Sequence, residues 1–424
     1  MSDREFSGFN VGTVADAVRQ PPLDDLRVAA RARRRQRTVG LALALVVAFA
    51  SMAVLPLAAG TRGVDWAGPD QPPVKPDRGG QLFLTGPGSG VVAGVWEGDG
   101  GCSTVRFRHT DDGGRSWTGD EATRYRTTRC GQDAEGRPLA TPEFSVLGQR
   151  SYLVRDGDLL KLSTDYGRTW RDAAQAMVPV SAFPAKARPV FCQWDMGCGA
   201  LREPVAVDPS TGAVYRLGGT PPSPYPPFSI YPSVDGAIWV TYWPGDIGVM
   251  VVARSVDRGA TWNTWRPAKG ADVRGVVGVS GQEAYLLINP PPPPGAPPMA
   301  VEGPVQLLRT TDGGKSWADV GTDLPDTPEG LAMTIGSDGA LLVAESDNVG
   351  GGNEVPTHTS RLWASRDSGR HFTTVRTYDR RDGGVGAAPG YAWLYGRDDM
   401  TVGGADHVQL TTDGATWTRF PLPD

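Results

Sequence analysis

Residues 310–317 read TTDGGKSW, and this stretch decides the fold because close copies of it recur along the chain. In each copy a Ser or Thr is followed by an Asp, a Gly and then a Trp or Phe at fixed spacing. We call this pattern the Asp/Gly/Trp motif. Five full copies and a sixth that is one residue shorter are present: Thr110-Asp112-Gly114-Trp117, Ser163-Asp165-Gly167-Trp170, Ser255-Asp257-Gly259-Trp262, Thr310-Asp312-Gly314-Trp317, Ser365-Asp367-Gly369-Phe372 and Thr411-Asp413-Gly414-Trp417.

The chemistry of the motif is that of a tight turn between two strands. Asp and Ser/Thr side chains bond nearby backbone N–H groups, and Gly adopts a backbone conformation that a side chain would forbid. The aromatic residue can then fold back over the hairpin and bury a large apolar area. A strand-like run such as Gln306–Arg309 precedes each copy. We therefore interpret the Asp, Gly and aromatic positions of the motif as structural.

The spacing of the motif predicts a β-propeller. The motif Asp residues at 112, 165, 257, 312, 367 and 413 are 53, 92, 55, 55 and 46 residues apart. The gap of 92 is close to two ordinary spacings, and Val205–Leu217 in its middle reads as strand, turn and strand. Counting this segment as a degenerate copy divides residues 81–424 into seven units of about 49 residues. We expect an all-β propeller of seven blades with four strands each, with six or eight blades left open.

The N-terminal part predicts a single membrane span. Residues 38–60 carry no charge and are long enough to cross a bilayer as a helix. Residues 1–37 hold eight Arg and five acidic residues, and positive charge favours the cytoplasmic side. We expect a cytoplasmic tail (1–37), a transmembrane helix (38–60), a Pro/Gly linker (61–80) and an extracytoplasmic propeller (81–424). A cleaved signal peptide is the alternative, although it would need an unusually long N-terminal region.

The motif resembles the Asp-box, also called the BNR repeat, over roughly residues 81–424. Proteins with this repeat include bacterial sialidases, sortilin-type receptors and several plant-polysaccharide hydrolases. The resemblance implies a shared propeller fold and differing functions, with the repeated turns remote from the ligand site.

A sialidase-like reading implies an Arg clamp for a substrate carboxylate, a Tyr nucleophile helped by a Glu, and an Asp acid/base. In that family the first Arg lies in a Phe/Tyr-Arg-Ile-Pro segment before the first repeat. This chain has no such segment there, and the nearest string, Arg419-Phe420-Pro421, lies at the far end. The sequence therefore assigns no catalytic residues.

Cofactor and nucleic-acid functions lack support in the sequence. The four His residues have no metal-ligand spacing to one another or to a Cys pair. With the N-terminal tail at +3 and a total of −5, the remainder is acidic at −8, whereas nucleic-acid binding needs a basic face. We expect no cofactor, no metal and no nucleic-acid partner.

The four Cys residues all follow the predicted span, and an even number in an oxidising compartment suggests two disulfides. In a propeller, the loops that carry Cys102 and Cys130 emerge on the same face. Cys192 and Cys198 would close a short local loop. We favour the pairs Cys102–Cys130 and Cys192–Cys198 among the three possible connectivities.

A ligand would bind on the face opposite the motif turns, where the long loops lie. Candidate residues there are Trp194, Trp243, Glu345 and Asp347. Our leading hypothesis is a membrane-tethered, non-catalytic binding module for a protein or glycan ligand outside the cell. The alternatives are a sialidase-like glycoside hydrolase and a cell-surface sensor or assembly factor.

Overall fold

A computed structural model describes residues 80–97, 101–119, 123–131, 141–193, 198–219, 222–244, 250–291, 304–325, 331–349, 357–380, 384–398 and 404–423. The predicted tail, span and linker, residues 1–79, lie outside these ranges. Within the described ranges, no helix has the length and apolarity that a membrane crossing requires. The predicted transmembrane helix is therefore unsupported by the structure.

The described part of the chain folds into seven four-stranded sheets. The first and second sheets are β1 (Gln81–Gly86), β2 (Ser89–Glu97), β3 (Ser103–Thr110), β4 (Arg124–Arg126), and β5 (Glu143–Gly148), β6 (Ser151–Asp156), β7 (Leu159–Ser163), β8 (Arg171–Asp172). The third is β10 (Arg188–Pro189), β11 (Val205–Val207), β12 (Val214–Leu217), β9 (Val178–Val180), and the short helix α3 (Ala173–Ala176) precedes it. The fourth and fifth are β13 (Pro227–Pro232), β14 (Ile238–Tyr242), β15 (Val251–Ser255), β16 (Asn263–Trp265), and β17 (Asp272–Gly278), β18 (Ala284–Asn289), β19 (Gln306–Thr310), β20 (Ala318–Asp319). The sixth and seventh are β21 (Leu331–Ile335), β22 (Leu341–Val349), β23 (Thr357–Ser365), β24 (Thr373–Arg380), and β25 (Val385–Ala388), β26 (Tyr391–Gly396), β27 (His407–Thr411), β28 (Trp417–Pro421).

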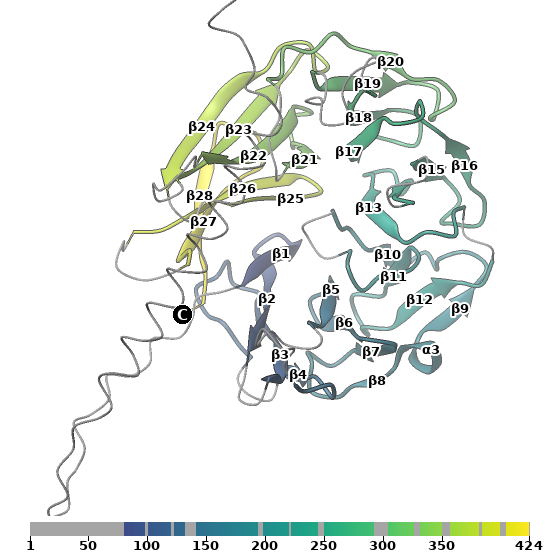
Figure 1. Cartoon of the computed structure of the whole chain (residues 1–424), viewed down its shortest axis with the longest axis vertical. Coiled ribbons are helices and arrows are strands. Elements are labelled where there is room, and N and C mark those ends of the chain that lie inside the picture. Colours follow the sequence, from purple (N-terminus) through teal and green to yellow (C-terminus); the bar gives the residue numbers. More distant parts are fainter. Residues whose placement is uncertain are drawn as a thin grey trace, which may run out of the picture. The chain divides into compact units, whose positions relative to one another are not determined.

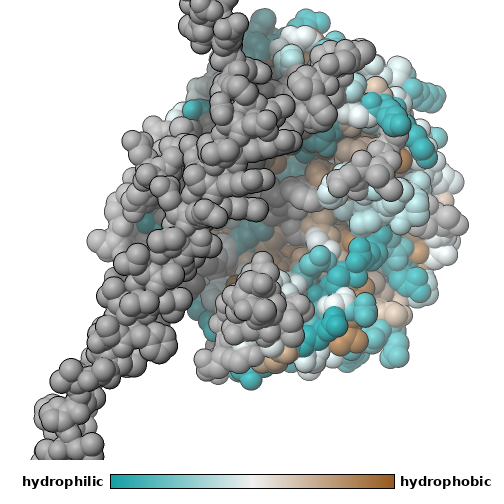
Figure 2. All heavy atoms as spheres, in the orientation of Figure 1, coloured by the Kyte–Doolittle hydropathy of each residue, from teal (hydrophilic) through white to brown (hydrophobic). Residues whose placement is uncertain are grey.

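The sheets are arranged around a ring, as Figure 1 shows, and six of them are antiparallel meanders in chain order. This arrangement confirms the predicted seven-bladed propeller. Strands near the centre of a sheet are packed against neighbouring sheets on both faces, so they read as continuous apolar runs: β14 and β18 are buried along their whole length. In the space-filling view of Figure 2, the described surface is mainly hydrophilic, with scattered hydrophobic patches.

The third sheet departs from the meander order. Its outer strand, β9, precedes its other strands in the chain and pairs with β12 in parallel. The hairpin β11–β12 corresponds to Val205–Leu217, the predicted degenerate copy of the motif. Its turn lies among the motif turns, because Ser151 Oγ donates to Gly212 O (2.8 Å). The degenerate copy therefore keeps the position of a motif turn without the full motif.

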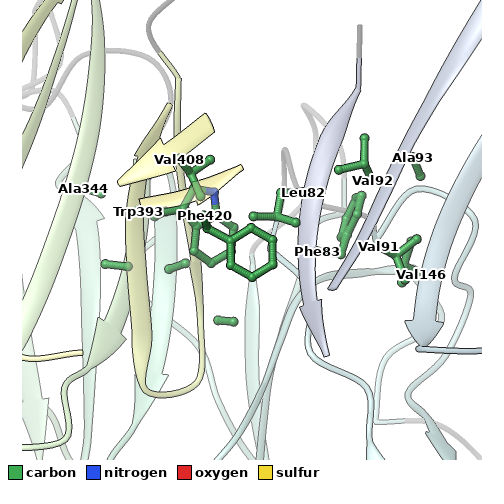
Figure 3. Packing of buried hydrophobic residues seen from close by; sticks show 14 of the residues in the cluster. Leu82, Phe83, Val91, Val92, Ala93, Val146, Ala344, Trp393, Val408 and Phe420 are labelled. Carbon is green, nitrogen blue, oxygen red and sulfur yellow. The ribbon is translucent and has the colours of Figure 1, made fainter. Parts of the chain in front are cut away.

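The ring closes by packing between the first and last sheets, with no shared strand. The Tyr395 hydroxyl accepts a hydrogen bond from Leu82 N (2.8 Å), and Trp117 Nε1 donates to Pro421 O (3.2 Å). Figure 3 shows the apolar layer at this seam, where Leu82 of β1 lies beside Trp393, Val408 and Phe420 of the last sheet. Residues 81–86 form the inner strand of the first sheet.

Both favoured disulfides, Cys102–Cys130 and Cys192–Cys198, are present. The first joins the segment before β3 to the segment after β4. The second closes a short loop in the connection between β10 and β11. Paired cysteines are typical of an oxidising, extracytoplasmic compartment.

Candidate functional site

The two ends of the sheets form two different faces of the propeller. One end carries the motif turns together with turns such as 233–237 between β13 and β14, and we call it the motif face. Because antiparallel strands alternate in direction, the start of each inner strand and the end of the next strand lie at the other end. We call that end the opposite face. It receives the start of β11, the start of β13 and the end of β14.

The aspartates of the motif are fully engaged in their own turns. Asp165 accepts hydrogen bonds from Thr169 N (2.9 Å), Thr169 Oγ1 (2.6 Å) and Ser163 Oγ (2.8 Å). Burial alone would raise the pKa of Asp165, but these hydrogen bonds outweigh it and lower that pKa. In the same way, hydrogen bonds from Ser116 and Thr110 lower the pKa of Asp112 to about 2. A carboxyl group held ionised by its own turn is suited to a structural role.

Glycine is required at the motif position because of backbone geometry and space. Gly114 has a φ of 79°, in the left-handed region. A Cβ at Gly114 would lie 2.4 Å from Pro421 O of the last sheet. The Gly of the first motif copy therefore permits the close packing that closes the ring.

The opposite face carries exposed aromatic side chains above the fourth sheet. Trp243 directly follows β14 and is 39% exposed, and Tyr225 precedes β13 and is 40% exposed. Phe228, near the start of β13, packs edge-on against Trp243 with ring centroids 6.3 Å apart. The Pro-rich run around Tyr225 restricts the backbone that presents it. Exposed aromatic rings on a rigid strand end form a flat apolar platform of the kind that ligand sites use.

Glu203 lies on the same face, two residues before β11 and close to Tyr242 of β14. Its carboxyl group is partly buried, and burial raises its pKa, while the nearby Arg216 guanidinium opposes that rise. Burial thus shifts the pKa of Glu203 in the direction opposite to that of the motif aspartates Asp112 and Asp165. Such a group keeps its proton to a higher pH than an ordinary glutamate.

Tyr242, the last residue of β14, lies close to Glu203. Its side chain is buried, and its hydroxyl has no hydrogen-bond partner among the described residues. Burial and the nearby charge of Glu203 both raise the pKa of Tyr242. A buried hydroxyl without a partner is costly for stability, so its retention beside a partly buried carboxyl group points to a functional role.

Several other carboxyl groups on the opposite face are paired with cations. Glu143 Oε2 lies 3.2 Å from Arg155 Nε, and Glu345 Oε1 lies 3.0 Å from Arg361 Nη1. Asp398, Asp406 and His407 bring possible metal-ligand atoms within 4.8 Å of one another. However, Arg419 Nη1 lies 2.7 Å from Asp398 Oδ2, and Arg419 also contacts Asp406. A cation of the protein thus already neutralises this acidic cluster.

The four ligand-face candidates from the sequence have different outcomes. Trp243 lies on the opposite face and is exposed, as expected. Glu345, a candidate ligand-face residue, lies in β22, where its side chain is buried and pairs with Arg361. Trp194 and the side chain of Asp347 lie outside the described residues, although the backbone of Asp347 is part of β22.

Sequence reasoning missed Glu203 and Tyr242. Glu203 lies in no motif and is one of 47 acidic residues, so its type carried no signal. Tyr242 ends an apolar strand and reads as a core residue. Tyr225 was easier to find from the sequence. It lies in a Pro-rich loop, and the long loops were expected on the ligand face.

No protein-family model matches the sequence, and no curated protein matches it either. Among solved structures, the chain is similar to a Hadza microbial sialidase (19% identity, 51% of this chain and 52% of that one, TM-score 0.31). It is also similar to the GH74 enzyme of Niastella koreensis (12% identity, 78% and 63%, TM-score 0.33). A third match is the α-L-arabinanase of Penicillium chrysogenum (12% identity, 67% and 81%, TM-score 0.32). The chain thus spans about half to two thirds of the first two structures, and likeness at this level concerns the fold alone.

These neighbours correct our leading functional hypothesis. We expected a non-catalytic binding module, but the similar solved structures are glycoside hydrolases and a polysaccharide lyase. This finding contradicts the expectation of a module without catalysis.

Proposed function

We propose that this protein is a glycoside hydrolase whose site lies on the opposite face, above β13 and β14. The observation that carries the proposal is the environment of Glu203: a partly buried carboxyl group close to Tyr242, which directly precedes the exposed Trp243 in the chain. The structural neighbours share only the fold, so the proposal rests on these residues.

Glu203 would act as the general acid. Cleavage of a glycosidic bond needs a carboxylic acid that is still protonated at the working pH, so that it can protonate the leaving oxygen. Burial supplies this property by raising the pKa of Glu203. Trp243 and Tyr225 would bind the sugar rings through their apolar faces and hold the glycosidic oxygen near Glu203.

A sialidase-like form of the activity is favoured by the pairing of Tyr242 with Glu203. Attack on an anionic sugar by a carboxylate is unfavourable, and sialidases use a Tyr nucleophile in its place. In this form an ionised Glu203 would take the proton of Tyr242, the Tyr242 oxygen would attack the anomeric carbon, and a water molecule would protonate the leaving oxygen. Arg216 and Arg202 supply positive charge near Glu203 that suits an anionic substrate. Tyr242 is buried, so this reaction would require Tyr242 to become accessible when substrate binds.

We also propose that residues 38–60 anchor the enzyme in a membrane, with the propeller outside the cytoplasm. The uncharged run, the Arg residues before it and the two disulfides support this placement. Alkaline carbonate extraction of membranes from producing cells should leave the chain in the pellet. Release of the intact chain into the supernatant would argue against the anchor.

The activity is tested with the purified full chain and a panel of fluorogenic glycosides that includes sialosides, glucosides, xylosides and arabinofuranosides. We expect turnover of at least one class, and kcat should fall on the basic side of its pH profile as Glu203 loses its proton. Turnover of sialosides alone would favour the Tyr242 mechanism. Absence of turnover across the panel and across polysaccharide substrates would refute the proposal.

A further inference from the structure

Glu203 lies on residues 190–204, which join β10 to β11 on the opposite face. This is one of the long connections of that face, similar in length to residues 290–305 between β18 and β19. A connection of this length is conformationally costly to order unless other contacts fix it. We call residues 190–204 the Glu203 segment.

The first half of the Glu203 segment is fixed in the centre of the ring. Cys192 N and O both hydrogen-bond the backbone of Ile230 in β13, at 3.1 and 2.8 Å. Gln193 Nε2 donates to Met333 O in β21 of the sixth sheet (2.9 Å). Phe191 packs edge-on against Tyr231, with ring centroids 5.7 Å apart. These contacts tie the segment to the inner strands of two other sheets.

The second half is fixed by side chains of the second sheet. Arg155 Nη2 donates to Ala200 O (2.7 Å), and Ala200 N donates to Ser145 Oγ (3.3 Å). The Arg155 side chain is only 14% exposed, and Glu143 holds its Nε. Ala200 and Leu201 are buried, and Leu201 N donates to Cys198 O (2.8 Å). The backbone is thus immobilised up to two residues before Glu203.

The Cys192–Cys198 disulfide joins these two halves. Cys192 is bonded to the inner strand β13, and Cys198 begins the half that Arg155 holds. Without the covalent link, the second half would depend on the few contacts to Arg155 and Ser145. The disulfide therefore restrains the residues before Glu203 relative to the inner strand β13.

We propose that the Cys192–Cys198 disulfide and Arg155 are positioning elements for Glu203, and that they hold its carboxyl group in its partly buried place beside Tyr242 and Arg216. The catalytic meaning of this role rests on the proposed function. The effect on the pKa of Glu203 can be measured whether or not the protein is an enzyme. The groups that face Glu203 are Arg216 on β12 and Tyr242 on β14, with Arg202 next to it in the chain. None of these belongs to the positioning elements.

The test compares the two disulfides of the full chain. The carboxyl pKa of Glu203 is measured by NMR with 13C-labelled glutamate, and the Glu203→Gln variant identifies its signal. In the double variant Cys192→Ser/Cys198→Ser the pKa should fall toward the ordinary value of about 4.3, because the segment loosens and the group gains solvent. The matched control Cys102→Ser/Cys130→Ser removes the other disulfide and should leave the pKa of Glu203 unchanged.

A second variant keeps the proposal testable if the double variant fails to fold. Arg155→Ala retains both disulfides and should also lower the pKa of Glu203, and Arg155→Lys should restore part of the shift. If the protein turns over a glycoside, kcat should drop about 100-fold in the positioning variants, since misplacement of a catalytic group by about 1 Å has that effect.

The outcomes separate the two proposals. An unchanged Glu203 pKa in the folded Cys192/Cys198 variant and in Arg155→Ala would overturn the positioning role. A pKa that falls as expected in a protein without glycosidase activity would support the positioning role and reject the proposed function.

Discussion

Asp165 in a motif turn and Glu203 on the opposite face are both partly buried carboxyl groups, yet their pKa values move in opposite directions. Burial raises the pKa of each, but Asp165 also accepts three hydrogen bonds from its own turn, and these reverse the shift. Glu203 is left with burial as the main influence. The motif face thus uses its carboxyl groups for stability, whereas the carboxyl group of Glu203 on the opposite face has the environment that the proposed chemistry needs.

The largest expected effect that tests this contrast is the loss of activity in Glu203→Gln. Removing a general acid should lower kcat by about 10²–10⁴-fold with a natural leaving group. The matched control is Glu283→Gln on the motif face, where Glu283 pairs with Arg309 at 2.7 Å. Steady-state kinetics should show normal kcat for Glu283→Gln. Equal losses in both variants would erase the distinction between the faces.

The next effect is on stability and belongs to the motif face. Asp165→Ala removes three hydrogen bonds from a turn, so it should lower the free energy of unfolding by about 1–3 kcal/mol. Urea unfolding followed by tryptophan fluorescence measures this loss. Asp158→Ala, at an exposed turn position, serves as control and should change the free energy by less than about 0.5 kcal/mol. A motif aspartate that can be removed without loss of stability would contradict its structural role.

A smaller effect is expected at the aromatic platform. Trp243→Ala should raise KM about fivefold with little change in kcat, because an aromatic contact contributes about 1 kcal/mol to binding. The exposed Val234 in a turn of the motif face provides the comparison. Val234→Ala should leave KM unchanged, and a matching rise in KM would count against a platform confined to the opposite face.

The smallest effect is in the pH dependence of stability. The folded pKa of Asp112 is about 2, below its ordinary value, so its contribution to stability is present above about pH 4 and is lost as the pH falls toward 2. The folded pKa of Glu203 is raised, so its contribution has the opposite sign and is lost as the pH rises through that pKa. Asp112→Asn should therefore weaken the acid dependence of unfolding. Glu203→Gln should weaken the dependence on the basic side, and both are measured by urea unfolding at a series of pH values.

Much of the fold was predictable because the motif marks the same hairpin in each unit. Six copies fixed the position of one turn per sheet, and the double gap located the degenerate third copy at Val205–Leu217. The parallel strand β9 was not predictable, because its three residues Val178–Val180 carry no pattern that specifies a partner. The closure of the ring depends on contacts such as Leu82 with Tyr395, which are 313 residues apart.

The candidate site was less predictable than the fold, because the burial and pKa of its residues depend on contacts between strands that are distant in the sequence. Trp243 could be named as an exposed loop aromatic from its place between strands. Glu203 acquires its raised pKa only when β12 and β14 bring Arg216 and Tyr242 beside it. No local sequence pattern encodes such a shift in pKa. Glu345 was named from the sequence as a candidate ligand-face residue, but the strand pairing places it in the interior. The register of β22 and β23 sets it opposite Arg361, with which it forms a buried ion pair.

The seam between the first and last sheets has a mechanical consequence. The contacts across it are side-chain packing and single hydrogen bonds, whereas each sheet is held by rows of backbone hydrogen bonds. A pulling force applied between the two ends of the propeller would load this seam directly. The ring would then open there as an intact array of sheets before any strand is peeled away.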